Sequence, residues 1–209
     1  MGSLGNLSSS SLMSLFSLCL CFLGGICLLE TNPLSTILFL LIFYVNTTVS
    51  ICLRPHDSSL RQGLVFCLLL STLAFATTSS LLFFFVFYEF SLIPVLGLTF
   101  IFGYQPEKVT ASLYLLIYTV VGSLPLFLFA VVYQGSVFSG LVSISGLTSL
   151  CISLAFMVKA PVYTLHVWLP KAHVESPLIG SILLAGVMLK LGAYGFIVMS
   201  PCLGQYTII

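Results

Sequence analysis

The chain has 209 residues, of which six are Lys or Arg and five are Asp or Glu, so only 5% of the residues are charged. Hydrophobic residues make up 59%, and the mean hydropathy is +1.23. Soluble domains carry about 25% charged residues because a folded surface must face water. This composition excludes a soluble globular protein, and the net charge of +1 excludes a nucleic-acid binder, which would present a basic face. We predict an integral membrane protein with a single membrane domain over 1–209.

Polar breaks divide the chain into apolar segments of a length that can cross a membrane, for which about 20 residues are needed. Strict alternation of apolar and polar residues, typical of a membrane barrel, is absent, so the predicted class is all-α. We predict seven transmembrane helices, at 11–29, 34–53, 61–77, 81–102, 109–132, 149–168 and 177–199. The sixth is predicted to be broken near 159–161, and the polar stretch 170–175 is predicted to be a loop. Trp168, at the end of the sixth helix, is typical of an anchor at the membrane interface.

Basic residues are divided unevenly among the predicted loops. The loops 54–61, 103–108 and 169–176 share one side of the membrane and hold Arg54, Arg61, Lys108 and Lys171. The loops 30–33, 77–80 and 133–148 lie on the other side and hold no Lys or Arg. By the positive-inside rule, the basic side faces the cytoplasm, or the matrix in a mitochondrion. The N-terminus is therefore expected on the basic side.

Three charged residues, Glu89, Lys159 and Lys190, fall inside predicted spans. At about 1.5 Å per residue they lie roughly 12, 15 and 20 Å from a membrane surface, near the middle of a core about 30 Å thick. A charge at that depth costs at least about 2.5–3.5 kcal/mol on insertion scales. Each must therefore face protein or water. The three side chains are predicted to form a row within the membrane plane.

The row suggests a proton relay, because a lysine that gains or loses a carboxylate partner can take up or release a proton. Pro161 is expected to interrupt the helix beside Lys159, since it has no N–H for the carbonyl of Met157. His166, two helical turns beyond Lys159, is a candidate for the next step. Two structural alternatives remain: the Glu89–Lys159 pair only locks the packing of the helices, or Lys190 reaches a lipid headgroup. For His166 the alternative is a histidine that is hydrogen-bonded within the bundle.

The seven cysteines show neither a Cys-x-x-Cys pair nor the spacing of metal ligands, so neither a metal site nor a disulfide framework is predicted. Their mostly apolar surroundings favour a packing role. No nicotinamide fingerprint, flavin site or set of cluster cysteines is visible. The chain itself is expected to hold no cofactor.

Three stretches of the sequence resemble a known family: FYEFSLIP at 87–94, QPEKVTASLYLLIYTVVGSLPL at 105–126 and LAFMVKAPVYTLHVWLPKAHVESPLIGSILLAGVMLKLGAYG at 154–195. They look like the subunit 4 family of mitochondrial NADH:ubiquinone oxidoreductase, respiratory complex I. That family belongs to the antiporter-like subunits, which also occur in bacterial multisubunit sodium/proton antiporters. The resemblance extends from about residue 30 to 195. It implies a location in the mitochondrial inner membrane, with the N-terminus in the matrix.

The resemblance assigns roles to individual residues. Glu89 matches the essential glutamate of the family, Lys159 the lysine of its broken helix, Lys190 the connecting lysine, and His166 a histidine of the same motif. The family fold contains two inverted five-helix repeats, and the third to seventh predicted helices resemble the first of them. The resemblance implies a proton-translocating subunit, with NADH, FMN, iron–sulfur clusters and ubiquinone held elsewhere in the complex.

The chain ends after the first repeat, at about half of the usual family length. We therefore expect a separate chain that carries the second half, besides the neighbouring antiporter-like subunits and lipid. Its contacts are expected to use the small residues of the seventh helix, Gly186, Gly192, Ala193 and Gly195. Two other functions remain open: a subunit of a multisubunit sodium/proton antiporter, and a structural half-subunit that does not pump.

Overall fold

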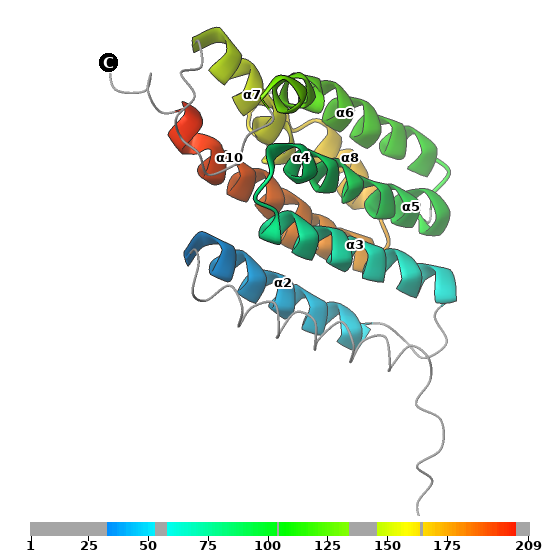
Figure 1. Ribbon diagram of the computed structural model, residues 1–209. Helices are drawn as coiled ribbons and strands as arrows, with labels where there is room; N and C mark the ends of the chain where they lie inside the picture. Colours follow the sequence, from blue (N-terminus) through cyan, green and yellow to red (C-terminus); the bar gives the residue numbers. More distant parts are fainter. Residues whose placement is uncertain (1–32, 53–57, 104, 134–145, 164, 204–209) are drawn as a thin grey trace, which may run out of the picture.

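The computed structural model describes residues 33–52, 58–103, 105–133, 146–163 and 165–203, and these residues form a bundle of helices (Figure 1). The elements are α2 (Pro33–Cys52), α3 (Ser59–Thr77), α4 (Leu81–Phe90), α5 (Leu92–Phe102), α6 (Lys108–Val132), α7 (Gly146–Lys159), α8 (Trp168–Glu175), α9 (Leu178–Leu183), the π-helical turn η1 (Leu184–Met188) and α10 (Leu189–Leu203). The all-α prediction is confirmed for this part of the chain.

Four helical stretches of the described residues are long and apolar enough to cross a membrane: Ser59–Thr77, Leu81–Phe102, Lys108–Val132 and Leu178–Ser200. Two shorter apolar helices, Leu34–Val49 and Gly146–Lys159, accompany them. The first predicted helix, 11–29, lies outside the described residues. A multi-helix membrane protein is therefore supported, and the count of seven spans stays a prediction.

The outer face of α6 is apolar, as expected for a helix beside lipid. Only 33% of its most apolar 18-residue stretch is buried within the chain. Ile117, Val121 and Leu128 are among its exposed side chains. Contiguous exposed apolar surface of this extent is rare on soluble proteins. α6 packs on its other side against α7 and α8, and α2 lies at the opposite edge of the bundle beside α3 (Figure 1).

An aromatic cluster joins four helices at the centre of the bundle. Its members are Phe75 of α3, Phe84 and Tyr88 of α4, Phe156 of α7 and Tyr194 of α10, with neighbouring ring centroids 4.4–6.4 Å apart. Centroid separations and tilted or edge-on rings of this kind are favourable for aromatic pairs. The cluster fixes α4 against α7, and these two helices carry the residues described in the next subsection.

The predicted helix 81–102 is divided into α4 and α5 by a turn at Ser91. Pro94 explains the division, because it cannot donate to the carbonyl of Phe90 one turn earlier. Ser91 stabilises the turn through its backbone N–H, which donates to the oxygen of Phe87 (3.1 Å), and through its hydroxyl, which donates to the oxygen of Tyr88 (2.7 Å).

The prediction of a loop at 170–175 was wrong, because these residues belong to α8. Pro170 suggested a break, but it is the third residue of the helix. A proline in the first turn is tolerated because its missing N–H would have no partner there. The last predicted helix, 177–199, contains the π-helical turn η1 between α9 and α10.

The glycines of the last helix do not play the part predicted for them. A Cβ atom at Gly186 would lie 2.8 Å from Val45 of α2, and one at Gly195 would lie 2.5 Å from the ring of Phe156. At Gly192 it would lie 2.7 Å from the backbone nitrogen of Ala160. These three glycines therefore let η1 and α10 approach other helices of this chain closely. Of the four small residues, only Ala193 is exposed for a contact with another chain.

Candidate functional site

Lys159 and Glu89 lie side by side inside the bundle. Lys159 is the last residue of α7 and is 1% exposed, whereas Glu89, near the end of α4, is 21% exposed. The Lys159 Nζ atom is 3.5 Å from Oε1 of Glu89. The predicted pairing of these two side chains is confirmed, so neither charge is buried alone.

Tyr88, which sequence reasoning missed, forms another side of the lysine site. The Lys159 Nζ atom is 3.4 Å from the centroid of the Tyr88 ring and donates to the backbone oxygen of Tyr88. The tyrosine is fully buried, and its hydroxyl donates to the backbone oxygen of Ala155 at 3.0 Å. An aromatic face attracts a cation, most strongly where water is excluded. Its position directly before Glu89 was the only sequence signal for this role.

Helix α7 ends at Lys159, and the backbone groups that lose their helical partners there form other hydrogen bonds. The N–H of Ala160 still donates to the oxygen of Phe156 (2.8 Å), and Pro161 has no N–H to give. The oxygen of Met157 accepts instead from the N–H of Val162, five residues on, at 3.3 Å. The regular ladder of hydrogen bonds therefore stops within one turn of Lys159.

Trp168 completes this helix end. Its indole Nε1 donates to the backbone oxygen of Val158 at 2.9 Å, and the side chain is only 1% exposed. The prediction that Trp168 anchors the chain at the membrane interface was wrong, because the indole is buried and ties α8 back to the end of α7. Ten residues separate the two partners, and the break between them hides this contact from any helical pattern.

His166 does not follow Lys159 on a common helix face. The chain leaves the helix after Lys159 and re-enters it at Trp168, so the expected two-turn spacing does not apply. The imidazole is half-buried, and its centroid lies 5.9 Å from that of Tyr163. Its Nδ1 atom is buried with no hydrogen-bond partner in the described part of the chain. The proposed hydrogen-bonded packing role therefore lacks a partner at Nδ1.

Lys190 lies close to the level of the pair but faces away from it. Gly192 contacts the backbone of Lys159 and Ala160, and Lys190 lies two residues earlier on the same helix. Two residues correspond to about 3 Å along the axis and about 200° around it. The side chain is exposed on the far side of α10, just after the π-helical turn η1. The structure brings Glu89 and Lys159 together and leaves Lys190 on another face.

The described residues contain no group of three His, Cys, Asp or Glu side chains that could hold a metal ion. The site itself offers one carboxylate, one ammonium group and one tyrosine. These groups can exchange protons with each other or with water. They provide no ligand set for a redox cofactor.

Known proteins resemble this chain in sequence. Residues 78–209 match the family model described as NADH:quinone oxidoreductase/Mrp antiporter, TM. Relatives named NADH-ubiquinone oxidoreductase chain 4 include those of Ceratitis capitata (35% identity, covering 89% of this chain and 51% of the relative), Tetraodon nigroviridis (40%, 80% and 41%) and Artemia franciscana (47%, 57% and 32%). The chain thus spans between a third and a half of the length of these relatives.

A solved structure shares the fold. A chain of the membrane-bound sulfane sulfur reductase, an archaeal respiratory membrane complex, matches with a TM-score of 0.74 over 91% of this chain and 47% of its own length. The sequence identity is 16%, so this likeness concerns the fold alone. The helices of this chain are therefore arranged as in about half of that chain.

Proposed function

Because this chain belongs to the NADH:quinone oxidoreductase/Mrp antiporter family of membrane subunits and is homologous to NADH-ubiquinone oxidoreductase chain 4, we propose that it is a proton-translocating subunit of the membrane arm of respiratory complex I. Its place would be the mitochondrial inner membrane, with the N-terminus on the matrix side. NADH, FMN, iron–sulfur clusters and ubiquinone would be held by other subunits. The chain's part would be to move protons in response to the redox reaction.

The observation that carries this proposal is the buried pair of Lys159 and Glu89 at the broken end of α7. An opposite charge favours the ionised form of its partner, so closing and opening such a pair couples proton uptake and release to movement. At 3.5 Å the pair is loose, and Oε1 of Glu89 has no hydrogen-bond partner among the described residues. A shift of either side chain would therefore cost no tight hydrogen bond between them.

We propose that Lys190 continues the relay within the membrane plane, and that His166 carries protons from Lys159 toward the basic side of the membrane. Lys190 is exposed on α10 at the level of the pair, and a lysine against lipid would cost several kcal/mol. Polypeptide that corresponds to the remaining length of the relatives would cover it, as part of a second five-helix repeat. Neighbouring antiporter-like subunits and lipid would complete the surroundings.

Replacing Lys159 tests the proposal. In the parent complex, Lys159→Ala is expected to lower the number of protons moved per NADH oxidised, while flavin and iron–sulfur absorbance stay unchanged. Lys108→Ala is the matched control, because Lys108 lies at the start of α6, and its Nζ atom donates to the backbone oxygens of Ile101 and Gly103 at the end of α5. An unchanged proton-to-electron ratio in Lys159→Ala would reduce the pair to a packing device and leave a structural half-subunit.

A subunit of a sodium/proton antiporter is the second candidate, since the family model includes Mrp antiporters. The same buried pair would serve both functions. The two functions differ in the other subunits of the complex, because the native complex of an antiporter carries no flavin and no iron–sulfur clusters. An absorbance spectrum of the purified native complex distinguishes them.

A further inference from the structure

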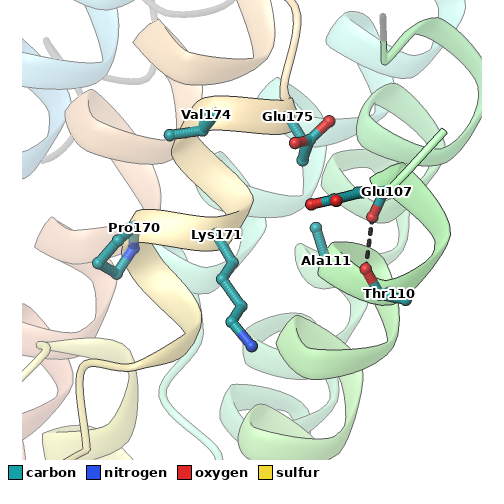
Figure 2. Close-up of a pocket in the computed structure, with 7 residues that line it drawn as sticks. All are labelled: Glu107, Thr110, Ala111, Pro170, Lys171, Val174 and Glu175. Atoms are coloured by element: carbon teal, nitrogen blue, oxygen red, sulfur yellow. Dashed lines mark hydrogen bonds between the residues drawn. The ribbon is translucent and has the colours of Figure 1, made fainter. Parts of the chain in front are cut away.

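A second polar site lies at the end of the bundle, in a cavity of about 330 Å³ between α6 and α8 (Figure 2). The lining residues are Glu107, Thr110 and Ala111 at the start of α6, and Pro170, Lys171, Val174 and Glu175 of α8. Glu107 directly precedes the span Lys108–Val132, so the cavity lies where that span begins. Glu89 lies thirteen residues before the end of the span Leu81–Phe102, about 20 Å from this level.

Glu175 is buried in this cavity without a partner among the described residues. It is only 6% exposed, and its Oε2 atom forms no hydrogen bond with the described residues. Figure 2 shows its carboxylate and that of Glu107 directed into the space between the two helices. Glu175 is also the last residue of α8, where the helix dipole is negative. A buried carboxylate in this position is unfavourable unless a positive group faces it.

Lys171 does not supply that positive group. Its Nζ atom lies 3.5 Å from the centroid of the Tyr114 ring, and in Figure 2 it points away from both carboxylates. The end of α8 is also held in place, because a Cβ atom at Gly103 would lie 2.9 Å from the backbone oxygen of Glu175. The carboxylate therefore belongs to a packed position of the fold, and no described residue supplies its missing partner.

We propose that this cavity binds a hydrated divalent cation of the Mg²⁺ type, with the carboxylates of Glu107 and Glu175 as its ligands. Hard cations prefer carboxylate and hydroxyl oxygens, and Mg²⁺ is commonly bound by one or two carboxylates while it keeps several waters. Since a water occupies about 30 Å³ in the liquid, the cavity has room for an ion with most of its hydration shell. Two facing carboxylates favour a double charge over a single one.

The hydroxyl of Thr110 is placed to contact the hydration shell. It donates to the backbone oxygen of Glu107 at 2.7 Å, and its lone pairs remain available to accept from a bound water. The ion would join the start of α6 to the end of α8, the helix that follows the break at Pro161. This site is independent of the proposed proton relay.

Manganese binding to the full chain in nanodiscs of uncharged phosphatidylcholine tests the proposal. The signal of free Mn²⁺ in electron paramagnetic resonance reports the bound fraction. We expect one site in the wild-type chain, at least tenfold weaker affinity in Glu175→Gln, and severalfold tighter affinity in Lys171→Gln, which removes a nearby positive charge. Glu30→Gln removes a carboxylate from the predicted loop 30–33, on the opposite side of the membrane, and is the control, with unchanged affinity expected.

Competition experiments identify the bound ion. Mg²⁺ is expected to displace Mn²⁺, whereas a tenfold excess of Na⁺ is not. The proposal is overturned if the wild-type chain binds no Mn²⁺, if Glu175→Gln and Glu30→Gln weaken binding equally, or if Lys171→Gln weakens it. Displacement by guanidinium but not by Mg²⁺ would also overturn it and would indicate a basic side chain of a partner. The gain in Lys171→Gln cannot arise from misfolding, and circular dichroism checks the helix content of the other variants.

Discussion

Two lysines of this chain lie over a tyrosine ring at almost the same distance, yet their surroundings differ. Lys159 Nζ is 3.4 Å from the centroid of Tyr88, and Lys171 Nζ is 3.5 Å from the centroid of Tyr114. Lys159 is buried and has Glu89 beside it. Lys171 is exposed, and the nearby Glu175 has no partner among the described residues. Where water reaches the ammonium group, an aromatic face is sufficient. Inside the bundle, the fold adds a carboxylate and a backbone oxygen.

The comparison indicates which of the two lysines needs a neighbouring carboxylate. A buried ammonium group that loses its carboxylate keeps the whole cost of leaving water, whereas an exposed one keeps its hydration. The structure therefore ranks the two sites by their sensitivity to a charge change. Glu89→Gln and Lys171→Gln test this ranking directly, and further substitutions test how Lys159 is held.

Glu89→Gln is expected to have the largest effect. The change keeps the size of the side chain but leaves the Lys159 ammonium group with only the oxygen and the ring of Tyr88. Removing one partner of a buried pair costs about 3–5 kcal/mol, and we expect about 3 because Glu89 is 21% exposed. The free energy of unfolding, measured by steric trapping in bicelles, gives the value.

Lys171→Gln is the counterpart at the exposed lysine. An exposed cation–π contact contributes about 0.5 kcal/mol, so the expected loss is of that order. If both variants lost the same small amount, the carboxylate of Glu89 would be unnecessary to the fold and the contrast between the two lysines would disappear.

Gly192→Ala is expected to have an intermediate effect. The added methyl group would lie 2.7 Å from the nitrogen of Ala160 and 3.0 Å from the carbonyl carbon of Lys159, which are backbone atoms and cannot turn aside. Overpacking of this kind costs about 1–3 kcal/mol. The free energy of unfolding is measured as for Glu89→Gln. We also expect reduced proton translocation, because the end of α7 that presents Lys159 has to shift.

Gly63→Ala is the matched control for this helix substitution. Nothing lies within 4 Å of a Cβ atom at Gly63 in α3, so alanine should raise stability by about 0.5–1 kcal/mol through its better helix propensity. A neutral Gly192→Ala would mean that α10 does not support the break as closely as the structure places it.

The sequence was informative where a single residue type has a strong physical preference. A membrane helix excludes charge, so Glu89 and Lys159 were recognised at once, and their equal depth with opposite charge predicted their contact. Proline lacks an N–H, so the interruption at Pro161 was predicted as well. The same rule misled at Pro170, because a proline in the first turn of a helix looks no different in the sequence from one that breaks it.

Contacts between distant elements could not be predicted in the same way. The bond from Trp168 to Val158 crosses the helix break, and the close approach of Gly192 to Ala160 depends on how α10 lies against α7. Glycines on a membrane helix indicate that something approaches closely, but they do not say which chain does so. Lys190 shows the opposite case, since its depth was predicted but the face it occupies depends on the packing of Gly192.

Tyr88→Phe is expected to have a smaller effect than Glu89→Gln, and it separates the two functions of this tyrosine. The substitution keeps the ring under Lys159 and removes only the hydroxyl, which donates to the oxygen of Ala155 at 3.0 Å. A typical hydrogen bond contributes about 0.5–1.5 kcal/mol, so we expect a loss of about 1 kcal/mol with proton translocation largely retained.

Tyr114→Phe is the matched control, since the hydroxyl of Tyr114 has no hydrogen-bond partner among the described residues and Tyr114 is 38% exposed, which predicts almost no change. If Tyr88→Phe abolished translocation while costing only 1 kcal/mol, the hydroxyl would act in the proton path itself, and the ring and backbone oxygen of Tyr88 would no longer be enough to explain how Lys159 is held.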